Sequence, residues 1–173
     1  MDLRKDCNIV FSGLKLGNHQ YDFTFNKSFF LEYDFNEFNN INVDVIVIME
    51  KKENMLVFNF EIKGSIVTEC DRCAEDLEIK IEGKNIHFMN FSEEKTEMND
   101  DDISNLNANA YEVNISDLIY EYIIILIPTK RVHLNNKACE SILDEFSILT
   151  EDENISETDE NIDPRWEALK NLK

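Results

Sequence analysis

The sequence has 173 residues, a hydrophobic fraction of 43% and a formal net charge of −19. This length fits one ordinary domain with a core, and twelve phenylalanines argue against an intrinsically disordered chain. The longest apolar run, at 123–127, is too short for a signal peptide or a membrane span. We therefore expect a soluble, cytoplasmic protein whose four cysteines stay reduced.

The negative charge is concentrated in two segments. Residues 92–102 hold six acids and one lysine, and residues 138–164 hold ten acids and no basic side chain. The rest of the chain is nearly balanced. Like-charge runs of this kind are typical of solvated segments, or of tails that meet a basic partner.

The first ninety residues predict antiparallel strands. Hydrophobic and polar residues alternate over 20–26, 42–49, 55–63, 77–81 and 86–88. This period of two is typical of strands buried on one face, and the polar residues 51–54 predict a hairpin connection. Within 27–38 the aromatic residues recur at helical spacing instead, so a short helix is expected there.

The second half predicts helices. Ser116 is placed to cap a largely buried helix over 117–127, which Pro128 ends, and 138–146 is expected to form another short helix. Asp163-Pro164 is a helix start, and it predicts an amphipathic helix over 163–173. The acidic stretch 147–162 between them is expected to be a disordered linker.

Together these patterns predict an α+β fold. A single domain over 1–146 would hold an antiparallel, strongly curved sheet or a partly open β-barrel in its first half. Helices from the second half would pack on this sheet, and an acidic loop would occupy 92–110.

Cys70 and Cys73 form a Cys-x-x-Cys pair, for which three interpretations remain open. A zinc site needs four ligands, and the residues that could complete it are Cys139, His133, His87 and Cys7. A redox dithiol usually opens a helix after a parallel strand, which the antiparallel context does not favour. The third interpretation is a tight turn between two strands, with Asp71 and Arg72 at its tip.

Two basic groups are candidates for binding RNA or a protein. Lys130, Arg131 and His133 follow the predicted buried helix, and Arg165 and Trp166 open the terminal one. The first group could contact phosphate or an acidic surface, or form a solvated loop that pairs with the chain's own acids. Arg and Trp are typical interface anchors, although Trp166 could equally pack on its own domain. No arrangement of residues indicates a catalytic site.

Four motifs resemble those of a known family in the same order. They are FSGL at 11–14, CDRC at 70–73, IPTKRVH at 127–133 and DPRWEALK at 163–170. The chain resembles the YceD family, which is associated with accumulation of large-subunit ribosomal RNA. Many members carry a second cysteine cluster after the Pro-Lys segment, which with the first pair looks like a four-thiolate metal site. Here only Cys139 stands in that region.

The resemblance implies a non-enzymatic factor that supports synthesis, processing or stability of 23S ribosomal RNA. Its expected partners are ribosomal RNA or a pre-50S particle and basic ribosomal proteins, with no membrane and no small-molecule substrate. The candidate contact residues are Arg72, Lys130, Arg131, His133, Arg165 and Trp166, with zinc at Cys70 and Cys73 as a candidate cofactor site. The alternatives are a protein–protein adaptor without a ribosomal role, and a thiol or metal protein that uses Cys70 and Cys73.

Overall fold

The computed structural model describes residues 5–92, 103–107, 109–134, 139 and 141. The chain divides into two compact units, Met1–His133 and Leu134–Lys173, and the elements below belong to the first. They are η1 (Lys5–Cys7), β1 (Asn8–Val10), β2 (Gly17–Asn26), α1 (Lys27–Leu31), β3 (Asn40–Lys51), β4 (Met55–Glu69), β5 (Asp76–Phe91), β6 (Ile103–Leu106), β7 (Glu112–Asn114) and α2 (Ser116–Ile125).

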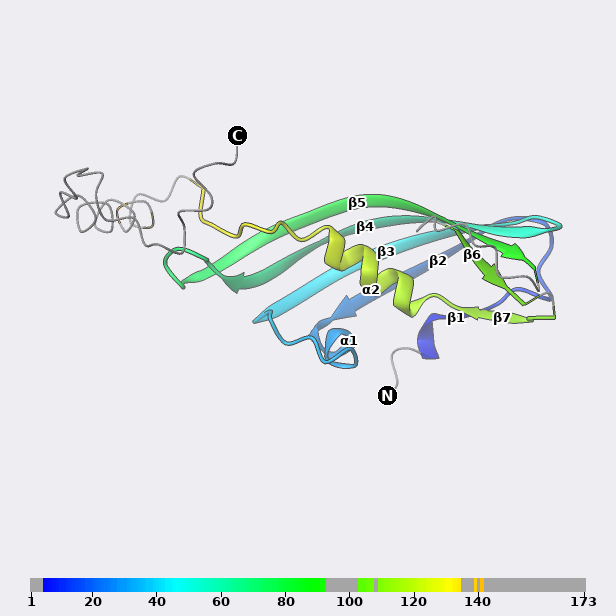
Figure 1. The fold of residues 1–173 in the computed structure, drawn as a ribbon, viewed down its shortest axis with the longest axis horizontal. Helices are drawn as coiled ribbons and strands as arrows, with labels where there is room; N and C mark the ends of the chain where they lie inside the picture. The colour runs from blue at the N-terminus through cyan, green and yellow to red at the C-terminus, as the bar shows by residue number, and fades with distance from the viewer. Residues whose placement is uncertain (1–4, 93–102, 108, 135–138, 140, 142–173) are drawn as a thin grey trace, which may run out of the picture. The chain divides into compact units, whose positions relative to one another are not determined.

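One five-stranded sheet, in the order β2-β3-β4-β5-β6, forms the centre of this unit (Figure 1). The first four strands are antiparallel neighbours, as the sequence predicts, whereas β6 pairs with β5 in parallel. A separate antiparallel pair joins β1 to β7. The sheet is not closed into a barrel, because β2 and β6 lie at its two edges. Of the two predicted forms, a strongly curved sheet and a partly open β-barrel, the described residues show a sheet and not the barrel.

Alternation of hydrophobic and polar residues decides which face of the sheet is buried. Val43, Val45 and Val47 of β3 are fully buried, and the residues between them are exposed. On β4, Phe58 and Phe60 belong to the same core. Helix α2 lies over this face, where the rings of Phe60 and Tyr122 are 5.1 Å apart (Figure 1). The opposite face of the sheet is therefore its outer surface.

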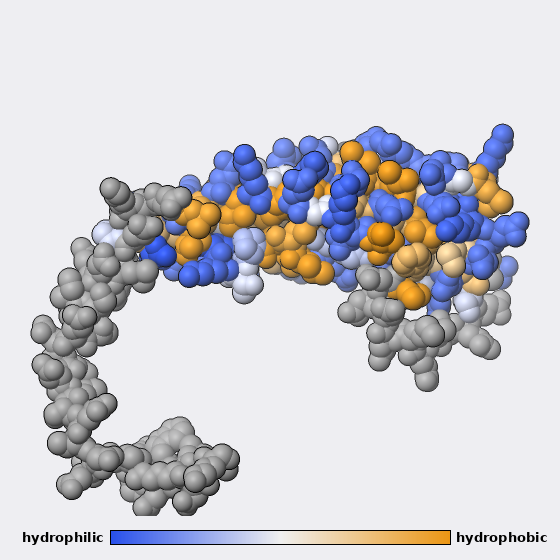
Figure 2. Space-filling view, turned by 90° about the horizontal axis from the view of Figure 1, so that it is seen from above, coloured by the Kyte–Doolittle hydropathy of each residue, from blue (hydrophilic) through white to orange (hydrophobic). Residues whose placement is uncertain are grey.

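The outer surface is mainly polar, with some hydrophobic side chains between the charged ones. Ion pairs join Lys63 to Glu82 and Lys84 to Glu61 across neighbouring strands. Ile86 is nevertheless 48% exposed. Figure 2 shows hydrophilic and hydrophobic residues interspersed on the side of the molecule that lies at the top of Figure 1.

Helix α2 confirms the predicted buried helix with a different N-terminus. Ile115 is the N-cap residue, and Asn114 Oδ1 accepts a hydrogen bond from the backbone N–H of Ser116 at 2.9 Å. Ser116 is thus the first helical residue, not the cap. At the other end of the helix, Leu126 lies so close to Gly83 that a Cβ atom on this glycine would overlap the Leu126 side chain.

Several further expectations differ from the structure or lie outside the described residues. Strand β6 lies within 92–110, where the sequence predicts a loop. The predicted linker 147–162 and terminal helix 163–173 lie outside the described residues, as does most of 138–146. Among the helices that the structure describes, none is long and apolar enough to cross a membrane.

Candidate metal centre

The Cys-x-x-Cys pair lies in the turn that joins β4 to β5. The backbone N–H of Cys70 donates to the carbonyl of Glu75 at 2.8 Å, and the N–H of Ala74 donates back to the carbonyl of Cys70 at 2.9 Å. Ala74 adopts a positive φ of 55°, which closes the turn. These bonds bring the thiols of Cys70 and Cys73 to one side, so the predicted tight turn is confirmed.

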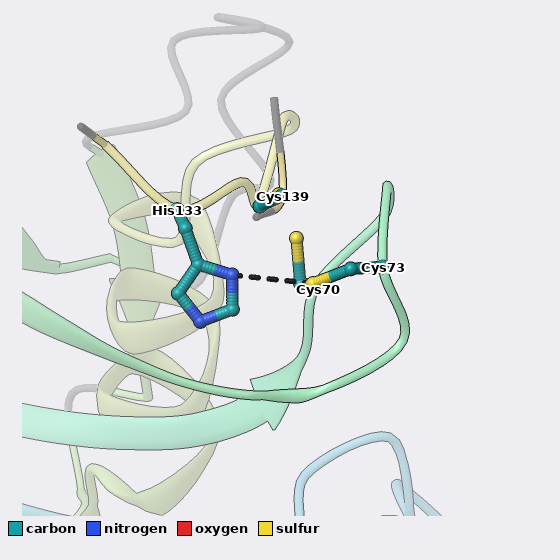
Figure 3. A group of neighbouring side chains, drawn as sticks. All are labelled: Cys70, Cys73, His133 and Cys139. Atoms are coloured by element: carbon teal, nitrogen blue, oxygen red, sulfur yellow. Dashed lines mark hydrogen bonds between the residues drawn. The ribbon is translucent and has the colours of Figure 1, made fainter. Parts of the chain in front are cut away.

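The segment after α2 brings His133 to this turn. Asp71 and Arg131 exchange two hydrogen bonds, from the N–H of Asp71 to the carbonyl of Arg131 and from the N–H of Arg131 to Asp71 Oδ2. His133 follows two residues later. Its Nδ1 lies 3.4 Å from Cys73 Sγ, and Figure 3 shows the imidazole facing the two cysteines.

The ligand atoms of Cys70, Cys73 and His133 all lie within 4.8 Å of one another. In a tetrahedral zinc site with Zn–S bonds of about 2.3 Å, neighbouring ligand atoms are about 3.7 Å apart. The His133 Nε2 atom is 3.1 Å from the carbonyl oxygen of Asp76, which can only accept, so Nε2 carries the proton. This bond orients the ring and leaves the Nδ1 lone pair for a metal, as in many histidine sites. The three residues therefore fit zinc in chemistry and in spacing.

The turn also favours the deprotonated thiol that a metal needs. Burial alone would raise the pKa of Cys70, but hydrogen bonds from the backbone N–H groups of Cys73, Arg72 and His133 outweigh it and lower the pKa to about 5. A hydrogen bond with Cys70 is in turn the main reason why the pKa of His133 is raised. Without metal, a thiolate at Cys70 therefore favours the protonated form of His133.

The other residues considered as zinc ligands are placed differently. His87 is buried on β5, where its ring nitrogens lie 3.0 Å from the Tyr122 hydroxyl and 2.9 Å from that of Ser104. Cys7 is in the hydrophobic core, where burial raises its pKa to about 12. Both residues are structural. Cys139 belongs to the second unit, six residues after His133 in the sequence.

The candidate basic residues of the first unit differ in their surroundings. Lys130 is exposed and Arg72 is half-buried, whereas Arg131 is held among the chain's own acids. Its guanidinium lies 3.5 Å from Glu37 and 3.6 Å from Asp71. Arg165 and Trp166 lie outside the described residues.

Sequence reasoning missed the supporting roles of Asp71, Asp76 and Glu37. Asp71 was considered only as the tip of a turn, although its carboxylate accepts the N–H of Arg131. Asp76 acts through its backbone carbonyl, for which a side-chain pattern contains no signal.

A comparison with known families matches most of the chain. The family model described as Large ribosomal RNA subunit accumulation protein YceD matches residues 58–173, about two thirds of the chain. The chain belongs to the YceD family. The region matched by the YceD model begins within β4 and includes the cysteine turn, α2 and the segment that carries His133. No curated protein and no solved structure matches the chain.

Membership in YceD links the chain to accumulation of large-subunit ribosomal RNA, as the family description says. The resemblance noted from the sequence motifs is confirmed.

Proposed function

We propose that this protein supports the accumulation of 23S ribosomal RNA by binding a component of the assembling large subunit, without catalysing a reaction. The observation that carries this proposal is the YceD match over 58–173, because it spans the cysteine turn and the whole segment that supports it. The place of action would be the cytoplasm, where the expected pre-50S particle is assembled.

We also propose that Cys139 completes a zinc site with Cys70, Cys73 and His133, the three residues whose ligand atoms lie within 4.8 Å of one another. Three thiolates and one imidazole are a common ligand set for structural zinc. The ion would cross-link the turn between β4 and β5 to the segment that follows α2. Its role would be to hold binding residues in place, because a site with four protein ligands leaves no position for a substrate.

The charged groups suggest how the partner is contacted. Half-buried Arg72, between Cys70 and Cys73, and exposed Lys130, three residues before His133, are candidates for contacts to RNA phosphate. Arg165 and Trp166 remain candidates for the same role at the C-terminus. The acidic segments 92–102 and 138–164 would contact basic ribosomal proteins, since opposite charge favours such encounters.

The proposal is tested in cells depleted of the native protein and supplied with variants. Depletion is expected to lower the ratio of 23S to 16S ribosomal RNA, and the wild-type chain to restore it. The double variant Cys70→Ser/Cys73→Ser should restore it poorly, whereas Cys7→Ala, which removes a thiol outside the centre, should behave as wild type. A ratio that does not change on depletion would contradict the proposed function.

Co-purification with and without ribonuclease then separates the two kinds of contact. Association with pre-50S proteins that survives ribonuclease indicates protein binding, and association that is lost indicates RNA binding. Association with neither would favour the adaptor alternative.

A further inference from the structure

We propose that a cleft beside the metal centre binds a lysine or arginine side chain of a partner protein. The cleft has a volume of about 450 Å³ and is bounded by the loop before β3, the end of β4 and the segment after α2. Its charged and polar lining includes Glu37, Thr68, Glu69, Asp71 and Arg131. The inference rests on the proposed function for the kind of partner, because a factor that acts on an assembling ribosomal subunit meets basic proteins.

The charge of the cleft favours a cation. The lining holds three carboxylates, those of Glu37, Glu69 and Asp71, and a single guanidinium, that of Arg131. Glu69 forms no ion pair with any residue that the structure describes. The lining therefore has an excess of negative charge, which attracts an ammonium or guanidinium group and repels phosphate.

Arg131 indicates how such a cation would be held. Its guanidinium lies between the carboxylates of Glu37 and Asp71, at 3.5 and 3.6 Å. Direct charge-assisted hydrogen bonds are shorter, about 2.7–2.9 Å, so neither contact uses the full hydrogen-bonding capacity of its carboxylate. Both acids can accept further hydrogen bonds from a second cation.

Thr68 is an independent sign that the cleft takes a ligand. This residue lines the cleft, is only 3% exposed, and its hydroxyl has no hydrogen-bond partner among the described residues. A buried polar group without a partner destabilises the folded state, so such groups are uncommon in folded proteins. An ammonium group has three N–H donors and can satisfy this oxygen and two carboxylates together.

The metal centre and the cleft are built from the same two segments of the chain. Cys70 lines the cleft as well as belonging to the candidate ligand group. Asp71 follows it directly, and Arg131 precedes His133 by two residues. An ion bound by Cys70 and His133 would therefore fix both sides of the cleft.

The test uses the zinc-loaded full chain and two probes, an eight-residue oligolysine and an eight-residue oligoarginine peptide. Binding is followed by calorimetry, and backbone amide shifts locate the contact. The double variant Glu37→Gln/Glu69→Gln is expected to weaken binding of the higher-affinity peptide roughly five- to tenfold. The reason is that it removes two exposed carboxylates that would pair with cations of the peptide. The matched control Glu53→Gln/Glu78→Gln removes the same charge outside the cleft and should change affinity less than twofold.

Thr68→Val supplies a second readout. Valine has nearly the same shape and no hydroxyl, so the free protein should become slightly more stable, by roughly 2–4 °C in melting temperature, while peptide binding weakens. A variant that binds the peptide as wild type does would overturn the role of Thr68.

Three results would overturn the proposal as a whole. They are equal loss of affinity in the two glutamate double variants, amide shifts confined to residues outside the cleft, and shifts of the cleft amides by a single-stranded RNA but by neither peptide. These measurements use purified protein, whereas the ratio of 23S to 16S RNA is measured in cells. Failure of the cleft and failure of the proposed function are thus separate results.

Discussion

Asp71 and Arg131, sixty residues apart, exchange two hydrogen bonds, at 2.7 Å between Asp71 N and Arg131 O and at 2.6 Å between Arg131 N and Asp71 Oδ2. They join the cysteine turn to the segment that carries His133. Because this connection involves no metal, two thiols and one imidazole come together through the fold itself. Zinc would then bind to a largely preformed site, which lowers the entropy lost on binding.

This connection can be removed by one substitution. Asp71→Ala deletes the acceptor for the Arg131 N–H, so we expect a loss of about 1–2 kcal/mol in the free energy of unfolding and a roughly tenfold weaker zinc affinity. Denaturant titration and competition with a chelator measure the two effects. Asp71→Asn keeps a carbonyl oxygen and should lose less of both. Equal losses in the two variants would show that charge, and not the hydrogen bond, is responsible.

Removal of single ligands tests the composition of the metal centre. The full chain is expected to bind one zinc ion, and Cys70→Ser, Cys73→Ser, His133→Gln and Cys139→Ser should each lower the affinity by more than the ~10- to 100-fold typical for a supporting residue. Elemental analysis and chelator competition measure stoichiometry and affinity. Cys7→Ala and His19→Gln serve as controls and should still bind one ion. Wild-type affinity in Cys139→Ser would assign the fourth position to another ligand.

The thiol of Cys70 gives the metal-free protein a characteristic pH dependence. Backbone hydrogen bonds lower its pKa from 9.0 to about 5, so thiolate absorbance should show one step near pH 5 that Cys70→Ser abolishes. The folded state binds this proton less tightly than the unfolded state. The stabilising effect is therefore complete above pH 9 and is lost as the pH falls towards 5. The difference in unfolding free energy between wild type and Cys70→Ser should accordingly grow from pH 5 to pH 9.

The contact between Gly83 and Leu126 makes a testable pair of substitutions. Gly83→Ala would place a methyl group against the Leu126 side chain, and overpacking of this kind is unfavourable by about 1–3 kcal/mol. In a Leu126→Ala background the same change should be neutral or stabilising, because alanine restricts the unfolded chain more than glycine does. Thermal unfolding of the four proteins gives the coupling energy. A cost that is equal in both backgrounds would exclude Leu126 as its cause.

The sequence predicted the strands well, because the alternation of hydrophobic and polar residues is a local pattern contained within each strand. The buried valines of β3 and the phenylalanines of β4 lie on the face that their period of two indicates. The parallel pairing of β6 was missed, since four residues of intermediate burial contain no clear periodicity. The helix start at Ser116 was also assigned too simply, because Asn114, two residues earlier, makes the hydrogen bond.

The candidate site could be predicted only in part. The spacing of Cys70 and Cys73 indicated a pair of thiols and a turn, and His133 was among several residues that could join them. The choice among these residues depends on contacts between distant segments. His133 reaches the turn through the Asp71–Arg131 bonds, while His87 is held by Tyr122 and Ser104. Sequence spacing contains no information on either arrangement.

The parallel ladder between β5 and β6 limits how the acidic segment can be studied. The chain leaves β5 at Phe91 and β6 begins beside Phe88, so the two strands need a connection at least as long as the ladder. Parallel neighbours cannot be joined by a tight turn. Excising 92–102 would therefore remove charge and topology together, and loss of function would have two explanations. Replacing its acids with Gln and Asn keeps the path length and isolates the charge.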